Sequence, residues 1–171
     1  MHDLERFIRD IPDFPKKGIV FKDITPLLAN AAAFRQVIDS IAEHYREHRI
    51  ETVVGIESRG FIISAAVAYV LRAGLSIVRK AGRLPHDTIA QRYNLEYGTD
   101  TLQMHRDAIV AGARVLLVDD LLATGGTAEA AIELIQRLRG EVVGAAFIIE
   151  LTGLKGRSRL SRIPVMQLMA I

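Results

Sequence analysis

The sequence predicts a single α/β domain built on a mostly parallel, twisted sheet with helices on both faces. After residue 50, short apolar runs alternate with longer segments of helical spacing, and this is the rhythm of successive βαβ units. The run 115–118 is apolar at four consecutive positions, which is typical of a strand covered on both faces. Residues 80–110 interrupt the rhythm with a polar insertion, and insertions of that length more often form a functional lid or hairpin than filler.

The first 30 residues have the character of an arm that precedes this core. An amphipathic opening leads to a proline-bounded turn at 12–15 and then to an extended segment at 18–21. A helix is predicted over 32–48, because apolar residues recur there at a spacing that buries one face. These apolar residues are Phe34, Val37, Ile38, Ile41, Ala42 and Tyr45.

The core elements then follow in alternation. We predict strands over 52–56, 75–78, 114–118 and 142–149, and helices over 61–71 and 127–138. The chain has no internal repeat and no low-complexity tract, so residues 1–171 are expected to form one domain, with 1–30 as the arm and 80–110 as the lid insertion.

Composition excludes several classes of function. The 171 residues are 50% hydrophobic and 25% charged, and 22 basic against 20 acidic side chains give a net charge of only +2, which is no nucleic-acid footprint. The absence of cysteine rules out disulfides, a thiol nucleophile and a thiolate zinc site, and it fits a reducing compartment. The longest apolar run, 61–71, is too short to span a bilayer. We therefore expect a cytoplasmic protein with no membrane or nucleic-acid partner.

The segment 115–127 joins a buried strand to two acids and a small-residue turn. Asp119 and Asp120 follow the apolar run, and they are expected where open α/β sheets bind ligands, at the carboxyl end of a strand. A turn with two hydroxyls and two glycines then opens a predicted helix, a combination that can close on an anion; its residues are Ala123, Thr124, Gly125, Gly126 and Thr127. Adjacent carboxylates disfavour a lone phosphate but suit sugar hydroxyls and Mg²⁺. The segment thus predicts a ligand with a phosphate, vicinal hydroxyls and a metal-bound leaving group, although a tight turn after a solvated strand end fits the bare glycine pair too.

Basic residues stand at two further strand ends. Arg59 follows the strand 52–56, and Arg79 and Lys80 end the strand that begins near residue 75. Because parallel strands end at one edge of a sheet, we expect these residues on the same rim as the two acids. A guanidinium forms bidentate hydrogen bonds to phosphate, so the group predicts a pyrophosphate site. Spacing alone fits Arg59 equally well as a surface arginine in a βα turn.

The thirteen residues 115–127 resemble the signature of the type I phosphoribosyltransferases, which use 5-phosphoribosyl 1-pyrophosphate (PRPP). Other segments resemble the adenine phosphoribosyltransferases and extend the likeness over almost the whole chain. They are Phe14-Pro15, Gly18–Pro26, Glu57–Phe61, Arg79–Pro85, Tyr93–Gly98 and Glu150–Gly156. The resemblance implies the type I phosphoribosyltransferase fold, with an N-terminal hood and a mobile lid hairpin. It also implies Mg-dependent transfer of phosphoribose from PRPP to adenine, giving AMP and pyrophosphate in purine salvage.

The same likeness implies where PRPP binds. The 5′-phosphate is expected on residues 123–127, the ribose hydroxyls at Asp119 and Asp120, and the pyrophosphate at Arg59 and Lys80, with Arg79 and Arg83 among the PRPP-binding residues. Arg83 stands in the mobile loop where the family usually has lysine. Mg²⁺ is expected to be held mainly by the pyrophosphate and the ribose hydroxyls, with no dedicated protein ligand.

For adenine, the likeness implies a site in the hood. Phe21 and Leu151 would flank the purine plane, and the backbone of Lys22, where most of the family has arginine, would read its Watson–Crick edge. Glu96 in the lid is the candidate proton carrier, because adenine must lose a ring proton as its nitrogen attacks the anomeric carbon. Tyr97 beside it would close over the substrates and exclude water. The family likeness also implies a homodimer.

Alternative interpretations remain open at this stage. A phosphoribosyltransferase for another base would carry a base-reading lysine followed by an aromatic residue late in the chain, and the tail 163–171 has neither. A PRPP-sensing regulator would lack the lid or append a DNA-binding unit. The run His44–His48 spells H-x-x-E-H, which formally matches an inverted zinc-protease motif. A match of five residues arises easily by chance, and this one lies on a predicted amphipathic helix, so a zinc site is the less favoured interpretation. The basic stretch 155–162 suggests RNA binding less than a solvated helix face, since no aromatic residue interleaves the charges.

Overall fold

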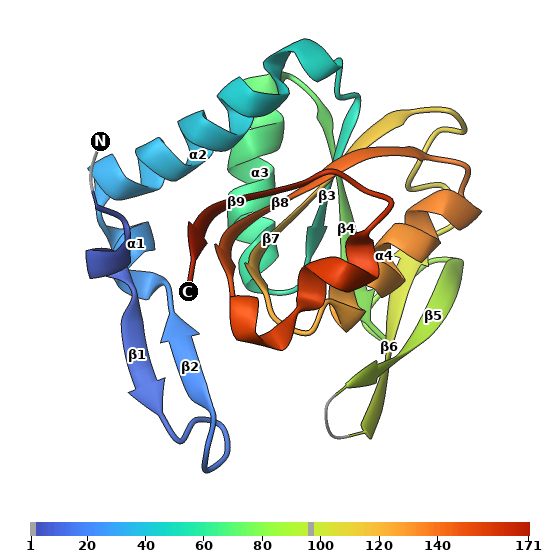
Figure 1. The fold of residues 1–171 in the computed structure, drawn as a ribbon. Helices are drawn as coiled ribbons and strands as arrows, with labels where there is room; N and C mark the ends of the chain where they lie inside the picture. Colours follow the sequence, from blue (N-terminus) through green and yellow to red (C-terminus); the bar gives the residue numbers. More distant parts are fainter. Residues whose placement is uncertain (1–2, 96–97) are drawn as a thin grey trace.

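A seven-stranded sheet forms the centre of the computed structural model, which describes residues 3–95 and 98–171 (Figure 1). The strand order is β5-β6-β4-β3-β7-β8-β9. The strands are β3 (Thr52–Ile56), β4 (Gly74–Lys80), β5 (Thr88–Leu95), β6 (Gly98–His105), β7 (Arg114–Leu122), β8 (Glu141–Glu150) and β9 (Val165–Ala170). Pairings from β4 through β3, β7 and β8 to β9 are all parallel, whereas β6 runs antiparallel to β4 and β5. The predicted mostly parallel sheet is confirmed.

Helices cover both faces of this sheet. The helices α2 (Ala31–Tyr45) and α3 (Arg59–Leu71) lie on one face and α4 (Gly126–Arg137) lies on the other (Figure 1). Strand β7 serves both layers, because its side chains alternate between the faces. Leu116 and Val118 belong to the core beneath α2 and α3, and Val115 and Leu117 to the core beneath α4. A strand buried on both faces needs an unbroken apolar run, which explains the sequence 115–118.

The N-terminal arm forms a second, separate sheet. The turn η1 (Glu5–Phe7) leads into strands β1 (Arg9–Pro12) and β2 (Val20–Asp23), which pair antiparallel, and α1 (Thr25–Ala29) returns the chain to the body. This two-stranded ribbon is called the hood below. Figure 1 shows the hood and the β5–β6 hairpin on opposite sides of the central sheet. The insertion predicted over 80–110 is therefore a hairpin in the described residues on either side of its tip.

Three segments differ from the prediction by more than two residues or in the type of structure. The helix predicted over 32–48 ends at Tyr45 and continues as the 3₁₀ turn η2 (Arg46–His48). Strand β7 runs to Leu122, so both acids lie within the strand; it does so because β8 keeps pairing with it as far as Leu122 opposite Glu150. The basic stretch 155–162 contains the 3₁₀ turn η4 (Gly156–Leu160) in place of the predicted helix face, and another 3₁₀ turn, η3 (Thr152–Leu154), precedes it.

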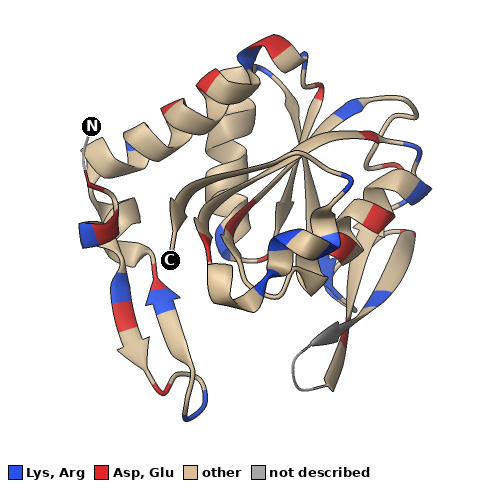
Figure 2. Cartoon of the chain, in the orientation of Figure 1, with Lys and Arg blue, Asp and Glu red and all other residues tan. Residues whose placement is uncertain are grey.

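Charges of both signs are spread over the elements (Figure 2). In the hood they alternate, and two ion pairs cross the ribbon, Arg9 with Asp23 and Lys22 with Asp10. None of the helices in residues 3–95 and 98–171 has the length and apolar character needed to cross a bilayer.

Candidate active site

The loops after β3 and β7 line one cavity of about 320 Å³ at the carboxyl edge of the sheet. The two strands are parallel neighbours, so their ends bring residues about 60 positions apart in sequence together. The predicted site residues that line the cavity are Arg59, Asp119, Asp120, Ala123, Thr124, Gly125 and Thr127. Glu57 and Ser58 complete the wall, and the peptide bond between them is cis. The structure thus brings the predicted acids, turn and Arg59 into one place.

Two carboxylates form the floor of this cavity. Asp119 stays partly exposed to the cavity, whereas Asp120 is buried. The backbone N–H of Asp120 donates to Asp119 Oδ1 at 3.0 Å. Removal from water raises the pKa of Asp119 well above its usual value, and the neighbouring Asp120 charge raises it further. Removal from water also raises the pKa of Asp120, against the opposing effect of the Arg59 guanidinium.

One oxygen of Asp120 is poorly satisfied. Arg59 Nε lies 2.8 Å from Asp120 Oδ2, but this oxygen accepts no hydrogen bond from any group in the described part of the chain. The contact is therefore an ion pair without an aligned N–H. Buried polar atoms normally have hydrogen-bond partners, so this buried oxygen, which is held by the ion pair with Arg59 alone, is an exception among the described residues.

Glycines hold the walls of the cavity close together. A Cβ at Gly60 would lie 2.5 Å from Asp119 Oδ1, so the first turn of α3 packs directly over this acid. Gly125 caps α4 with φ +83°, a left-handed conformation that favours glycine. Helix α4 begins at Gly126, and the N–H groups of its first turn have no partners within the helix. Residues 123–127 are called the phosphate loop below, after the prediction that they bind a phosphate, and these N–H groups are the donors that such binding would use.

Arg59 joins the cavity to the hood. Beyond its ion pair with Asp120, its Nη1 donates to the Lys22 carbonyl at 2.9 Å. Its guanidinium carbon lies 4.6 Å from the centroid of the Phe21 ring, in a cation–π contact. One side chain therefore touches the acidic floor and two residues that were predicted to bind the base.

The hood closes over a second cavity, of about 470 Å³. Phe21, Lys22 and Leu151, the three predicted base-binding residues, all line it. Arg59 and Thr127 line both cavities, so the two adjoin. The ammonium of Lys22 lies 2.8 Å from Asp10 across the hood ribbon, so the side chain is engaged within the hood.

The remaining basic residues are held by acids beside the cavity. Arg79 Nε lies 2.7 Å from one oxygen of Glu57, and Arg83 Nη1 lies 3.3 Å from the other. Lys80 Nζ lies 3.1 Å from Asp100 on β6. Of the three basic residues predicted to converge on this rim, Arg59 lines the first cavity, whereas Arg79 and Lys80 are paired near it.

The hairpin contributes a residue that sequence analysis missed. Tyr93 on β5 interacts with Thr127 and Asp100, and burial raises the pKa of its phenol. Tyr93 lies in the segment 93–98, which was singled out for its family likeness. Tyr93 and Gln91 are two positions apart on a strand, so their side chains lie on the same face of the hairpin, and this spacing was the available signal. Glu96 and Tyr97, predicted as proton carrier and lid residue, lie outside the described residues.

Comparisons with known proteins identify the family. A phosphoribosyl transferase domain model matches residues 23–164. An adenine phosphoribosyltransferase from Pelobacter propionicus is 58% identical over 160 residues, which cover 94% of this chain and 93% of the relative. A crystal structure of the Rhodothermus marinus adenine phosphoribosyltransferase superposes with a TM-score of 0.95 at 54% identity, over 98% of this chain and 96% of that one. The Saccharomyces cerevisiae enzyme, solved with adenine and an imino-altritol bisphosphate, superposes with a TM-score of 0.92 at 40% identity, over 97% and 96%.

The solved structures share the type I phosphoribosyltransferase fold that the strand order and the phosphate loop of this chain display. The identities extend over nearly all of both chains, hood and hairpin included. The chain belongs to the phosphoribosyl transferase family and, within it, to the adenine phosphoribosyltransferases.

Proposed function

We propose that this chain transfers the 5-phosphoribosyl group of PRPP to adenine, giving AMP and pyrophosphate, in purine salvage. The observation that carries the proposal is the pair of adjoining cavities. One has an acidic floor and a helix N-terminus, which suit a ribose and its 5′-phosphate. The other adjoins it under the hood and has the aromatic and aliphatic walls that suit a purine.

PRPP is assigned to the first cavity. The phosphate loop, Ala123 to Thr127, binds the 5′-phosphate, and Asp119 and Asp120 accept hydrogen bonds from the ribose hydroxyls. The place of both acids in the lining of the first cavity supports this assignment. Holding the ribose at its hydroxyls and its phosphate fixes the anomeric carbon relative to the incoming base, which is where positioning accelerates a displacement.

The pyrophosphate is assigned to Arg59, Arg79, Lys80 and Arg83. Their present partners are acids beside the cavity, so pyrophosphate replaces Glu57, Asp100 and Asp120 as the acceptor when it binds. Mg²⁺ supplies neutralisation of the leaving group when bound. Among residues 3–95 and 98–171 there is no group of three His, Cys, Asp or Glu residues that could hold a metal ion. We assign the Mg²⁺ mainly to the pyrophosphate and the ribose hydroxyls.

Adenine is assigned to the second cavity. Phe21 and Leu151 flank the purine plane, and the Lys22 backbone reads its Watson–Crick edge. Glu96 carries the ring proton as the nitrogen attacks the anomeric carbon, and Tyr97 helps to close the lid over the substrates. The base then adds as pyrophosphate leaves, with inversion at the anomeric carbon through an oxocarbenium-like transition state.

A panel assay tests the proposal. Purified protein is supplied with PRPP, Mg²⁺ and one free base at a time, and nucleotide formation is measured. We expect AMP from adenine, with no product from hypoxanthine, guanine or xanthine. Product from one of the other bases would move the chain to a different salvage activity, and PRPP binding without any product would make it a PRPP sensor.

The same assay with Glu96→Ala tests the proton carrier. We expect turnover to fall while the affinity for PRPP stays close to that of the parent, because the carboxyl acts on the base. Equal losses in both would assign Glu96 to positioning. The homodimer and the cytoplasmic location stay predictions.

A further inference from the structure

The turns η3 and η4 form the back of the phosphate loop. Gly156, the first residue of η4, packs backbone to backbone against Ala123 and Gly125, so closely that a Cβ on Gly156 or on Gly125 would overlap the other segment. The position of the phosphate loop is therefore fixed from behind by the position of η4. Leu160 ends η4 inside the core beneath α4, which anchors one end of the turn.

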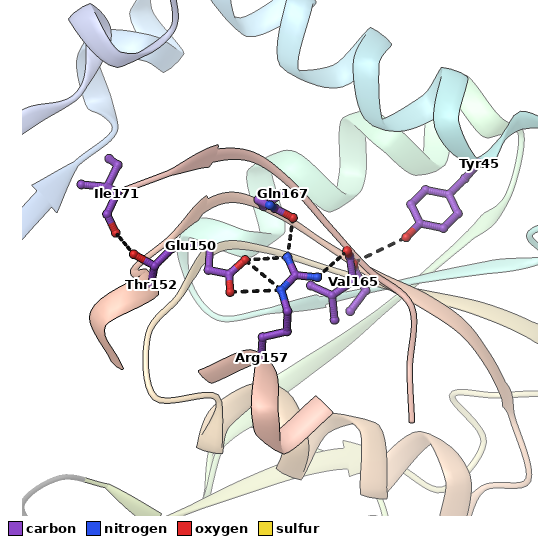
Figure 3. A network of polar contacts seen from close by, with 8 residues as sticks. Tyr45, Glu150, Thr152, Arg157, Val165, Gln167 and Ile171 are labelled. Carbon is purple, nitrogen blue, oxygen red and sulfur yellow. Dashed lines mark hydrogen bonds and ion pairs between the residues drawn. The ribbon is translucent and has the colours of Figure 1, made fainter. Parts of the chain in front are cut away.

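Arg157 anchors the other end, immediately after Gly156. Its Nη2 lies 2.5 Å from Glu150 Oε2, and its Nε lies 3.1 Å from each oxygen of the same carboxylate. Nη1 donates to the Val165 carbonyl at 2.9 Å, and Nη2 also donates to Gln167. Figure 3 shows the Arg157 guanidinium between Glu150, the last residue of β8, and Val165 and Gln167 in the first half of β9.

The network fixes the orientation of the Arg157 side chain more than it adds to the free energy of unfolding. The Glu150 side chain is only 8% exposed, and the desolvation of a buried ion pair largely offsets its attraction. A guanidinium that satisfies a carboxylate, a carbonyl and an amide at once has one allowed orientation. Arg157 thereby sets the orientation of the residue before it, Gly156.

The same turns also shape the base cavity. Leu151 directly precedes η3 and Leu154 ends it, and both line the cavity under the hood. The chain is pinned at this point, because Leu151 N–H donates to the Leu122 carbonyl and Thr152 donates to the Ile171 carbonyl. Residues 151–156 thus lie between the base wall and the back of the phosphate loop.

We propose that Arg157 is a positioning residue that sets the phosphate loop through Gly156, and thereby the affinity for the 5′-phosphate. The inference rests on the proposed function of the phosphate loop. Arg157 touches neither cavity, since it is absent from the linings of both within the described residues. Its effect on PRPP is therefore transmitted by the backbone contact between η4 and residues 123–125.

The test compares Arg157→Met with Arg159→Met. Arg159 lies in the same turn and pairs at 3.0 Å with Glu129, but this pair is half exposed and lies on the outer face of α4. We expect Arg157→Met to raise the KM for PRPP and the Kd for AMP on the order of tenfold or more, because small displacements of a binding group are costly. The turnover of Arg157→Met at saturating PRPP should change by less than about threefold, since Arg157 touches no reacting atom. Arg159→Met should change the KM for PRPP and the turnover by less than about twofold, since it touches no reacting atom either and its ion pair is exposed.

Further variants separate positioning from stability. Arg157→Lys keeps one contact of the three and is expected to fall between parent and Arg157→Met. Glu150→Gln, which removes the charge partner without removing volume, should shift the KM for PRPP in the same direction. Ile41→Val, a core change on α2 far from the loop, should lower the melting temperature while leaving that KM unchanged.

Binding of inorganic phosphate, followed by ³¹P NMR, makes the outcome independent of turnover. If the parent forms no AMP but binds phosphate and Arg157→Lys binds it more weakly, the proposed function fails and the inference stands. If the parent is active and both Arg157→Lys and Glu150→Gln keep its KM for PRPP and its phosphate affinity, the inference is overturned, whether or not Arg157→Met folds.

Discussion

The phosphate loop and the hood are attached to the protein in opposite ways. The loop continues the central strand β7 into α4 and is enclosed by α3 at Gly60 and by η4 at Gly156. The hood is a two-stranded ribbon outside the main sheet, and its tip leaves Phe14 and Val20 about half exposed. Two-stranded ribbons have little stability of their own. The phosphoribosyl end of the site is thus preorganised by the core, whereas the base end depends on an appendage.

Arg59 contacts both regions. It starts α3 on the rigid side, and it contacts Phe21 and the Lys22 carbonyl on the hood side. If pyrophosphate binds Arg59 as proposed and draws the guanidinium toward itself, the contacts of Arg59 with Phe21 and with the Lys22 carbonyl would change as well.

The largest expected effect comes from the rigid end. Replacing both acids, in Asp119→Asn/Asp120→Asn, should lower turnover by on the order of 1,000-fold, because the amides cannot match the charge that holds the ribose and faces the developing cation. Initial rates with adenine and PRPP measure it. Unchanged kinetics would remove the assignment of the ribose hydroxyls to this pair.

The same double variant should keep its fold, and its stability should depend on pH in a particular way. Both pKa values are raised in the folded protein, so above the unfolded value of about 3.9 the folded state holds more protons than the unfolded state. The parent's free energy of unfolding therefore falls as pH rises through this window. In thermal melts, the melting temperature of the variant relative to that of the parent should increase as pH rises from about 4. A difference in melting temperature that does not depend on pH would contradict the raised pKa values of Asp119 and Asp120.

A glycine in the loop gives the next largest effect. Gly125→Ala should raise the KM for PRPP by roughly 100-fold, because the new Cβ overlaps Gly156 and displaces the loop. Gly112→Ala is the matched control, since Gly112 has the same φ of +83° but open space around a Cβ. Both changes carry the backbone cost of about 1–2 kcal/mol, measurable by thermal melts. Equal KM values for the two variants would show that the overlap is harmless.

The sequence predicts those parts of the fold and the site that depend on local patterns of residues. Strands β3 and β7, helix α4 and the turn 123–127 come from local apolar patterns and turn residues, so their positions were predicted within a few residues. The meeting of Arg59 with the acids followed from a general rule about parallel strands. These parts depend on contacts whose geometry is the same in every open α/β sheet.

The unpredicted parts depend on particular pairs. The contact from Arg59 to the Lys22 carbonyl joins a helix start to a ribbon outside the sheet, and no periodicity encodes where the ribbon lies. Likewise, Glu57 holds both Arg79 and Arg83, and Arg157 reaches Glu150 and Gln167. In the sequence these were only an acid in a turn and one arginine in a basic stretch. The partners of Glu57 lie on β4 and in the turn after it, and those of Arg157 are set by the register of β8 and β9.

A smaller effect is expected at the junction of the two regions. Arg59→Met should raise the KM for both adenine and PRPP roughly tenfold, since hydrogen bonds to a charged group contribute about 1.5–3 kcal/mol. Steady-state kinetics with each substrate varied in turn measure this. Arg9→Met, which removes the exposed hood pair with Asp23, is the control and should leave both constants close to the parent's. An effect confined to PRPP would show that Arg59 does not hold the hood.

The smallest effect is expected at Lys22 in the hood. The Lys22 ammonium pairs with Asp10, whose side chain is 56% exposed, and the Lys22 carbonyl faces Arg59. Lys22→Met should therefore leave the KM for adenine within about threefold of the parent's and lower the melting temperature by no more than about 3 °C, because such a pair contributes at most about 1 kcal/mol. Asp10→Asn breaks the same pair from the other side and should behave alike. If Lys22→Met raised the KM for adenine more than about tenfold while Asp10→Asn did not, the Lys22 ammonium itself would bind the base. The hood would then recognise adenine through a side chain as well as through its backbone.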